Sequence, residues 1–77
     1  MASVNREQVL RAVGGTIASR RRESKLSQEQ LAERSGLHRT YIGAVERGIR
    51  NPTVTSLTQL AVGLACRPSD LLAEAGL

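Results

Sequence analysis

Several residue types are scarce in this chain of 77 residues, and each scarcity excludes a class of structure. One cysteine, Cys66, cannot form an internal disulfide, and one cysteine with one histidine cannot complete a tetrahedral structural zinc site. Tyr41 is the only aromatic residue, so the core must be built from valine, leucine, isoleucine and alanine. We therefore expect no metal and no cofactor. A domain this small commonly gains stability from a partner subunit, which favours a homodimer.

Long apolar runs and export signals are also missing. No apolar stretch approaches the length that crosses a bilayer, and the first residues lack a basic segment followed by an apolar one. With a lone cysteine, this favours the reducing cytoplasm. The sequence contains no glycine-rich phosphate loop, paired carboxylates or nucleophile motif, so we expect a protein that is not an enzyme.

The charge is unevenly distributed along the chain. Residues 1–50 hold ten basic and five acidic side chains, a net charge of +5, whereas residues 51–77 hold one basic and two acidic, a net charge of −1. A cationic front half favours a polyanionic partner on one side of the molecule. A solvated basic surface without a partner would have the same composition, so charge alone does not decide between the two.

The first helix is predicted over residues 5–24, where apolar residues recur every three or four positions. Gly14 and Gly15 lie inside this pattern, and each lowers helix stability by roughly 1 kcal/mol relative to alanine. Either the helix breaks there or another backbone packs closely against it, and we expect a continuous helix with close packing. The cationic segment 20–25 complements the helix dipole, and some of its arginines can also reach phosphate.

Residues 27–48 contain two short predicted helices joined by a glycine turn. Ser27 and Gln30 form a capping box at the start of the first of them. Gly36 ends this helix, because the tight turn needs a left-handed backbone conformation that glycine adopts without a Cβ clash. The second helix is predicted over residues 39–47. This arrangement is typical of a helix-turn-helix, which presents its second helix to a DNA groove.

Three single residues could suggest chemistry, but each has a structural explanation. His38 has no second histidine and no neighbouring Asp or Ser constellation, so we expect it to cap the helix that follows. Cys66 is most simply a small apolar residue at a helix end, with a redox switch as the alternative. Tyr41 could belong only to the core, but we expect its hydroxyl to lie at the surface as well.

Residues 53–76 are predicted to form two more helices that complete the core and carry the dimer interface. Thr53 can cap the fourth helix, and Pro68 suits the first position of the fifth. The whole chain, residues 1–77, is therefore predicted to be one all-α domain of five helices.

Four positions at fixed spacing identify a family. Ala32 lies where two helices would cross closely, Gly36 forms the turn, and Ile42 and Val45 fix the second helix from its inner side. With these positions, residues 15–72 resemble the lambda-repressor-like (XRE-type) helix-turn-helix family. Two segments, 36–43 and 46–52, are most similar to the controller proteins of restriction–modification systems. The resemblance implies a five-helix lambda-repressor-like DNA-binding domain with a central helix-turn-helix.

A recognition helix enters the major groove with its N-terminal residues towards the bases. On a helix that begins near Arg39, the outward positions include Arg39, Thr40 and Ala44, which we expect to contact bases. Arg39 can donate twice to guanine, and Thr40 can hydrogen-bond or pack its methyl group against thymine. Gly43 is also expected to face outward, where its small size would let the helix approach the base edges.

Other residues are expected at the DNA backbone or the edge of the groove. The resemblance places Gln28, the first residue of the second helix, on a phosphate. Tyr41, Arg47, Arg50 and Asn51 can supply charged, hydroxyl and amide contacts to the backbone.

Glu46 requires a different role, because an acid that faced DNA would be repelled. Its spacing from Ile42 and Gly43 turns it towards the first helix. The resemblance implies an arginine partner there, which in this chain is Arg21. We therefore expect a structural Arg21–Glu46 ion pair.

Leu71, Leu72 and Leu77 exceed what a small monomer needs to cover its core. Related proteins dimerise through this region, so the resemblance implies a homodimer with Leu71 and Leu72 at its interface. The alternative is that these two leucines complete the core of one protomer. We expect one of them to face inward and the other to pair.

The resemblance implies a sequence-specific transcription regulator that binds a pseudo-palindromic operator in double-stranded DNA as a dimer. It would control its own promoter and that of an endonuclease, with RNA polymerase as a candidate partner. A phage-like repressor or a DNA-binding antitoxin is the alternative within the same class. A module that uses this fold only for protein docking is a third hypothesis.

Overall fold

The computed structural model describes residues 3–77, which form five helices and no strand. The helices are α1 (Arg6–Glu23), α2 (Gln28–Ser35), α3 (Arg39–Glu46), α4 (Val54–Gly63) and α5 (Pro68–Glu74). This confirms the predicted all-α, five-helix fold. Among the described residues, we find no helix long and apolar enough to traverse a lipid bilayer.

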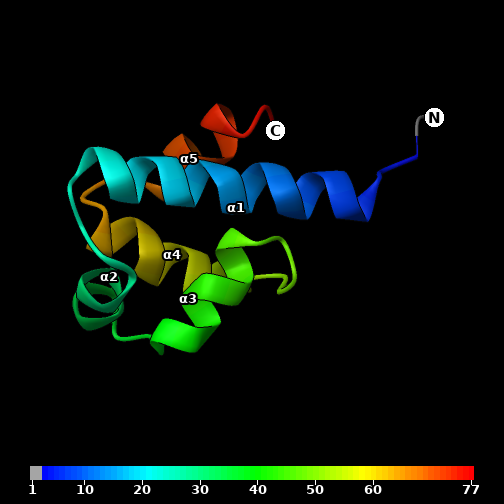
Figure 1. Cartoon of the computed structure of the whole chain (residues 1–77). Helices are drawn as coiled ribbons and strands as arrows, with labels where there is room; N and C mark the ends of the chain where they lie inside the picture. The colour runs from blue at the N-terminus through cyan, green and yellow to red at the C-terminus, as the bar shows by residue number, and fades with distance from the viewer. Residues whose placement is uncertain (1–2) are drawn as a thin grey trace.

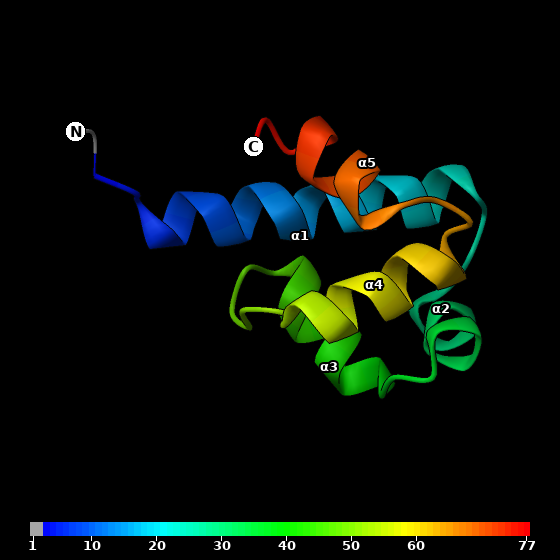
Figure 2. The same cartoon turned by 180° about the vertical axis from the view of Figure 1, so that it is seen from behind.

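The longest helix, α1, spans the molecule, and the others pack on two sides of it (Figure 1). In this view α3 and α4 lie below α1, and α5 lies along its upper side. The reverse view agrees with this arrangement (Figure 2). α1 contacts α3 and α5, while α2 contacts α3 and α4. The first turns of α1 project beyond the other helices towards the N-terminus, which leaves them accessible beside the end of α3.

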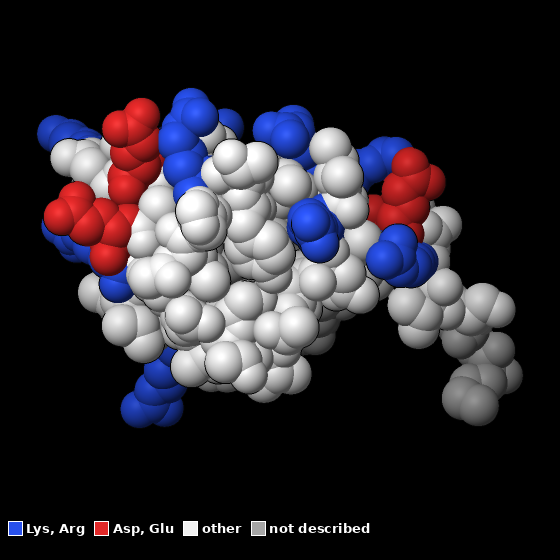
Figure 3. All heavy atoms as spheres, turned by 90° about the horizontal axis from the view of Figure 1, so that it is seen from below, with Lys and Arg blue, Asp and Glu red and all other residues white. Residues whose placement is uncertain are grey.

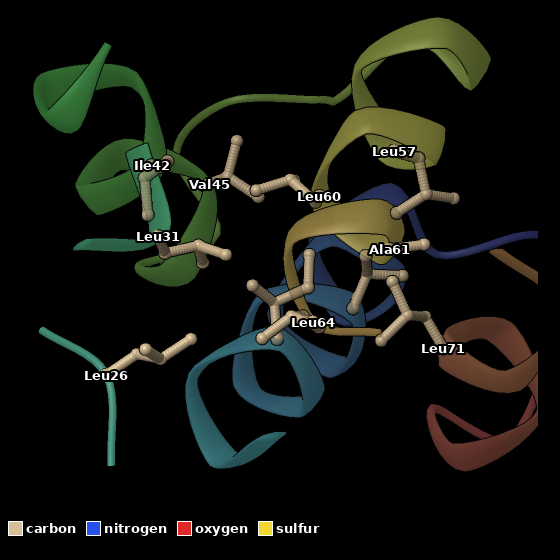
Figure 4. Packing of buried hydrophobic residues seen from close by; sticks show 11 residues of the cluster. Leu26, Leu31, Ile42, Val45, Leu57, Leu60, Ala61, Leu64 and Leu71 are labelled. Carbon is tan, nitrogen blue, oxygen red and sulfur yellow. The ribbon is translucent and has the colours of Figure 1, made fainter. Parts of the chain in front are cut away.

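The fully buried core is aliphatic, as the lack of aromatic residues required. Figure 4 shows side chains from α2, α3, α4 and α5 converging on one centre. The most deeply buried large residues, all with no exposed surface, are Ile17, Leu31, Ile42, Leu60 and Leu71. Each such side chain stabilises the fold by about 1.5–3 kcal/mol when it leaves water. The core therefore holds the second and third helices in a fixed relation to α1.

Side-chain caps fix the starts of three helices. The predicted capping box at α2 is present: Ser27 Oγ accepts from the Gln30 backbone amide at 3.0 Å, and Gln30 Oε1 accepts from the Ser27 amide at 2.8 Å. Asn5 and Thr53 cap α1 and α4 with their side-chain oxygens. His38 occupies the N-cap position of α3, but its side chain makes no capping hydrogen bond. The predicted N-cap position of His38 is therefore confirmed, but its side chain does not supply a capping hydrogen bond.

α1 continues without a break through Gly14 and Gly15. A Cβ on Gly14 would lie 2.2 Å from the Val45 carbonyl oxygen and 2.8 Å from the Glu46 carbonyl oxygen. Glycine is therefore required at residue 14, because α3 lies directly against the α1 backbone there. Gly15 is exposed, and a Cβ on it would meet nothing within 4 Å. The predicted close packing of another backbone is therefore confirmed at Gly14 but not at Gly15.

Candidate DNA-binding site

The turn between α2 and α3 has the conformation that its glycine predicted. Gly36 adopts a left-handed conformation with φ of 73°. The Ala32 carbonyl accepts from the Gly36 amide at 2.9 Å and from the Leu37 amide at 3.2 Å, which satisfies an otherwise unpaired group at the end of α2. Gln59 of α4 donates its side-chain amide to the Ser35 carbonyl at 3.2 Å. This last contact was not predicted, because its partners lie far apart in the sequence.

α3 presents one face to solvent and buries the other. Ile42 and Val45 are 0% and 1% exposed, so they fix the rotation of α3 about its axis. Arg39 and Thr40 stand exposed on the first turn of α3, and Ala44 is half-buried one turn later. The three residues expected to contact bases therefore lie on the free side of α3.

Arg39 makes one weak intramolecular contact. Its Nε lies 3.8 Å from Glu29 Oε1 of α2, and both side chains are largely exposed. Exposed ion pairs of this kind contribute about 0–1 kcal/mol. A nucleic-acid ligand can therefore engage the Arg39 guanidinium at little cost.

Gly43 does not occupy the outward position that was expected for it. It is buried, and a Cβ there would lie 3.1 Å from Arg47 Nη1 and 3.7 Å from both polar atoms of the Gln28 carboxamide. The small residue makes room for these two side chains and not for the DNA. The expectation erred because the position lies at the edge of the outward arc, where a long arginine one turn later folds over it.

Glu46 is the centre of a nearly buried polar cluster. Arg21 donates to it twice, from Nε to Oε2 at 2.7 Å and from Nη2 to Oε1 at 3.0 Å, and their side chains are 12% and 6% exposed. Arg21 Nη1 also donates to the Leu26 carbonyl at 2.8 Å. The expected Arg21–Glu46 ion pair is present in this geometry. The hydrogen bond to Glu46 raises the pKa of the Arg21 guanidinium above its ordinary value, so the arginine remains charged.

Gln28 belongs to the same cluster. Its Nε2 donates to Glu46 Oε1 at 3.0 Å, an interaction that the sequence did not reveal. A carboxamide nitrogen carries two hydrogens, so one donor remains for an external acceptor such as a phosphate. The cluster thus fixes the Gln28 side chain at the start of α2, beside α3.

Tyr41 connects α3 with the start of α4. Its hydroxyl is hydrogen-bonded to Ser56 Oγ at 2.8 Å, and Ser56 Oγ in turn donates to the Thr53 carbonyl at 3.2 Å. The Arg50 guanidinium lies 6.0 Å from the centroid of the Tyr41 ring, at the outer limit of a cation–π contact. Tyr41 is half-buried, but its hydroxyl, which was expected at the surface, is hydrogen-bonded to the buried Ser56. Sequence reasoning missed Ser56, although its place three residues after the Thr53 cap was visible.

The segment after α3 turns back beside its last residues. The Ala44 carbonyl accepts from the amides of Ile49 and Arg50, which ties the segment to the end of α3. Arg47, Arg50 and Asn51 are exposed, so all three remain available to an external partner. Asn51 also lines an apolar groove on the side of the segment away from α3.

Figure 3 views the side of the molecule on which α2 and α3 lie in Figure 1. Lys and Arg side chains gather along one edge of this face, and acidic side chains stand at its left and right margins. The broad centre is uncharged. Cations gathered beside an uncharged surface suit a polyanion that contacts the protein through both its charges and its base edges.

Leu71 and Leu72 have different surroundings. Leu71 has no exposed surface and belongs to the core, so it cannot lie at an interface as expected. Leu72 is half-buried against the core from outside. The helical period explains the difference, because successive residues point about 100° apart. The inward leucine of the expected pair is Leu71.

α5 is also attached to α1 through charge. Arg20 donates from Nε to Glu74 Oε2 at 2.8 Å and from Nη2 to Glu74 Oε1 at 3.0 Å. Cys66 lies nearby and is half-buried. Burial raises the pKa of the Cys66 thiol, so the thiol stays protonated near neutral pH and packs as a small apolar group.

Two helices joined by a left-handed glycine, with the second helix fixed from behind and exposed in front, define a helix-turn-helix DNA-binding protein. The helix-turn-helix family model matches residues 17–71. The chain therefore belongs to the helix-turn-helix family of DNA-binding transcription regulators.

Individual relatives indicate which kind of helix-turn-helix protein the chain resembles. The chain is 54% identical over 61 residues to control protein C.SmaI of Serratia marcescens, a match that covers 79% of this chain and 73% of that protein. It is similar to the restriction-modification controller protein C.AhdI from Aeromonas hydrophila, with 42% identity, a TM-score of 0.79, and coverage of 80% of this chain and 94% of that one. The restriction-modification controller protein C.Esp1396I is 36% identical, with a TM-score of 0.80 and 87% coverage of each chain.

Proposed function

We propose that this chain is a restriction–modification controller protein that acts as a homodimer in the cytoplasm. It binds a pseudo-palindromic operator, regulates its own promoter and an endonuclease promoter, and works there beside RNA polymerase. The similarity to C.SmaI and C.AhdI supports the class of protein. The observation that carries the proposal is the exposure of Arg39 and Thr40 on a helix whose opposite face is fixed by buried Ile42 and Val45.

Base contacts come from the first turn of α3. Arg39 has donors in the fork geometry that matches the O6 and N7 of guanine, and Thr40 offers a hydroxyl and a methyl group. Ala44, one turn later, is small enough to pack against a thymine methyl. Gln28 and Arg47 both lie next to buried Gly43, where the remaining Gln28 donor and the Arg47 guanidinium can contact phosphates.

Backbone contacts also come from the segment that follows α3. Arg50 is exposed beside Tyr41, and Asn51 is exposed next to it. Tyr41 acts on the DNA edge through its ring, since its hydroxyl is engaged by Ser56. Arg50 thus adds a second exposed cation to Arg47 beyond the end of α3.

The homodimer uses a groove between α1, α5 and the segment before α4. This groove, of about 220 Å³, is lined by Val9, Val54, Leu72 and Leu77 among other residues, and none of the described residues that line it is charged. A two-fold interface pairs the same patch of both protomers, so an uncharged face avoids like-charge repulsion in a chain of net charge +4. Val54 is 82% exposed and Leu77 60%, which leaves apolar surface for a partner to cover. Leu72 is the leucine of the expected pair that remains at the interface.

Selection of bound sequences from a random duplex pool tests the proposal. We expect a selected sequence with dyad symmetry and half-sites about one helical turn apart. Arg39→Ala should relax the base preference at one position in each half-site and weaken binding by about 1–3 kcal/mol per contact. A pool without symmetry or sequence preference would contradict the proposal. If Arg39→Ala weakened binding to every sequence equally, Arg39 would be assigned a phosphate contact and not a base contact.

A further inference from the structure

One side of α1 faces the end of α3 and the turn that follows it. Residues Glu7, Arg11, Gly14, Ala18 and Arg21 recur at spacings of four and three, so they form one stripe, here called the α3-facing stripe. Its middle and C-terminal members touch α3 or are buried. Gly14 meets the carbonyls at the end of α3, and Arg21 binds Glu46. The first two members lie further towards the N-terminus, before the residues that the family model matches.

Arg11 lies against Gly48, in the turn that follows α3. A Cβ on Gly48 would lie 3.1 Å from Arg11 Cγ and 3.3 Å from Arg11 Cα and N. Gly48 is therefore in contact with the α1 backbone at this point, and it has a left-handed φ of 75°. The stem of the Arg11 side chain packs on the turn that leads from α3 to Arg50.

The Arg11 side chain remains largely free. It is 66% exposed, and its guanidinium forms an ion pair with Glu7 one turn earlier, which is 73% exposed. An exposed pair at this spacing is weak, so a stronger anion can replace the carboxylate. Glu7 and Arg11 belong to the N-terminal turns of α1, the end that projects in Figure 1.

We propose that Arg11 is an additional DNA-phosphate contact and that Glu7 limits its strength. The proposal depends on the proposed DNA-binding function. When α3 lies in the major groove, the turn at its end approaches the sugar-phosphate backbone, and Arg11 is packed on that turn. Binding transfers the Arg11 guanidinium from Glu7 to a phosphate and leaves the Glu7 carboxylate near the DNA. The N-terminal turns of α1 thus add a phosphate contact through Arg11. The nearby Glu7 carboxylate opposes non-specific binding.

Four variants test this proposal on the full chain and an operator duplex obtained by selection. Arg11→Gln removes the charge but keeps a stem that can pack on Gly48, and Arg11→Lys restores the charge. Glu7→Gln frees the Arg11 guanidinium. Arg6→Gln is the matched control, because Arg6 is an exposed arginine on the same helix that lies about 140° around the axis from Arg11. Dissociation constants are measured at several salt concentrations between roughly 50 and 300 mM, so that the slope of log K against log[salt] can be determined.

Each contact to a phosphate contributes about 0.9 to the salt slope, or roughly 1.8 for a dimer on two half-sites. Arg11→Gln should lower the slope by about that amount and weaken binding roughly three- to tenfold on specific and non-specific duplexes alike. Glu7→Gln should strengthen binding, Arg11→Lys should restore the slope, and Arg6→Gln should change it by less than half as much as Arg11→Gln.

The proposal is overturned if Arg11→Gln matches Arg6→Gln in affinity and slope, or if Arg11→Lys fails to restore the slope in a protein that is folded by circular dichroism. Failure of the proposed function is a separate result. In that case the wild-type chain itself binds no duplex, or Arg39→Ala leaves the base preference unchanged.

Discussion

At the scale of single residues, two adjacent glycines in α1 have opposite structural roles. Gly14→Ala places a Cβ 2.2 Å from the Val45 carbonyl oxygen, so α3 must move away from α1. We expect a loss of about 1–3 kcal/mol of unfolding free energy, even after the gain in helix propensity. Urea unfolding followed by circular dichroism measures this change.

Gly15→Ala is the matched control for this prediction. A Cβ on Gly15 meets nothing within 4 Å, and the residue is exposed within the same helix. We expect a gain of about 0.5–1 kcal/mol, because alanine loses less backbone entropy than glycine. If both substitutions stabilised the fold, the close approach of α1 and α3 at Gly14 would be wrong.

The Arg21–Glu46 pair allows a second prediction at this scale. Both side chains are nearly buried, so Arg21→Met leaves the Glu46 carboxylate with the Gln28 amide as its remaining described partner. We expect this change to cost about 3–5 kcal/mol of unfolding free energy. The double variant Arg21→Met with Glu46→Leu should cost clearly less, because no charge stays buried without its partner. Thermal unfolding of both variants measures the difference, and equal losses would show that packing, and not charge, dominates.

The sequence predicted some of the contacts around Glu46 and missed others. Arg21 and Glu46 were paired in advance because both carry charge and match positions of a known family. The Gln28 hydrogen bond to Glu46 and the burial of Gly43 were not predicted. Both depend on how two helices meet, and helical period alone does not give the reach of a long side chain across that contact.

At the scale of elements, four helices end in the same hydrogen-bonded turn. In each, the second residue after the C-cap donates its amide to a carbonyl five residues earlier; Leu26, Ile49, Cys66 and Leu77 are these donors. The residue before each donor has a left-handed backbone. Gly48 and Gly76 adopt this conformation easily, whereas Lys25 and Ala65 adopt it at φ of 58° and 55°. Two of the four turns therefore carry backbone strain.

Ala65→Gly should relieve the strain at the end of α4. A left-handed conformation costs a residue with a Cβ about 1–2 kcal/mol. Removing this strain stabilises the fold, but glycine also raises the entropy of the unfolded chain, which offsets roughly 0.4–1 kcal/mol of the gain. We expect a net gain of about 0.5–1 kcal/mol, measured as a rise in the urea midpoint without a change in slope.

The reciprocal control is Gly36→Ala in the turn between α2 and α3. Gly36 has φ of 73°, and the nearest atom to a Cβ there is the Gln59 side-chain nitrogen at 3.7 Å. Strain is therefore the main cost, and we expect a loss of about 0.5–1 kcal/mol. A gain in stability from Gly36→Ala would contradict the assignment of strain to these turns.

Local sequence rules accounted for most of the elements. Capping residues, turn glycines and apolar spacing predicted all five helices, because these features act within a few residues of where they occur. They could not show that His38 starts α3 without a side-chain cap, or that Lys25 and Ala65 take glycine-like conformations. In those places tertiary packing fixes the backbone, and the local residue adapts to it.

At the scale of the whole molecule, charge and apolar surface are separated. Lys and Arg side chains gather on the side of α2 and α3, whereas the groove lined by Val9, Val54 and Leu77 contains no charged residue among those described. One face thus suits a polyanion and another suits a second copy of the chain. The uneven charge of the sequence predicted the first face. The second is assembled from α1, α4 and α5, so no single stretch of sequence reveals it.

Two valines of α4 test which surface joins the protomers. Val54 and Val62 are 82% and 68% exposed, but only Val54 belongs to the lining of the uncharged groove. Val54→Glu places an acidic charge in the uncharged groove of each protomer, and we expect it to weaken dimerisation by at least roughly tenfold. The substitution should not harm the protomer, because an acid in the first turn of a helix is favourable.

Val62→Glu is the control, with the same change in charge on the same helix. Sedimentation velocity across a concentration series gives the dimer dissociation constant of each variant. At low occupancy, the complex with both half-sites filled should depend on the square of the Val54→Glu concentration, since each half-site then recruits a separate protomer. Equal effects of the two substitutions would place the interface elsewhere. A stronger effect of Val62→Glu would move it to the outer face of α4, away from α1 and α5.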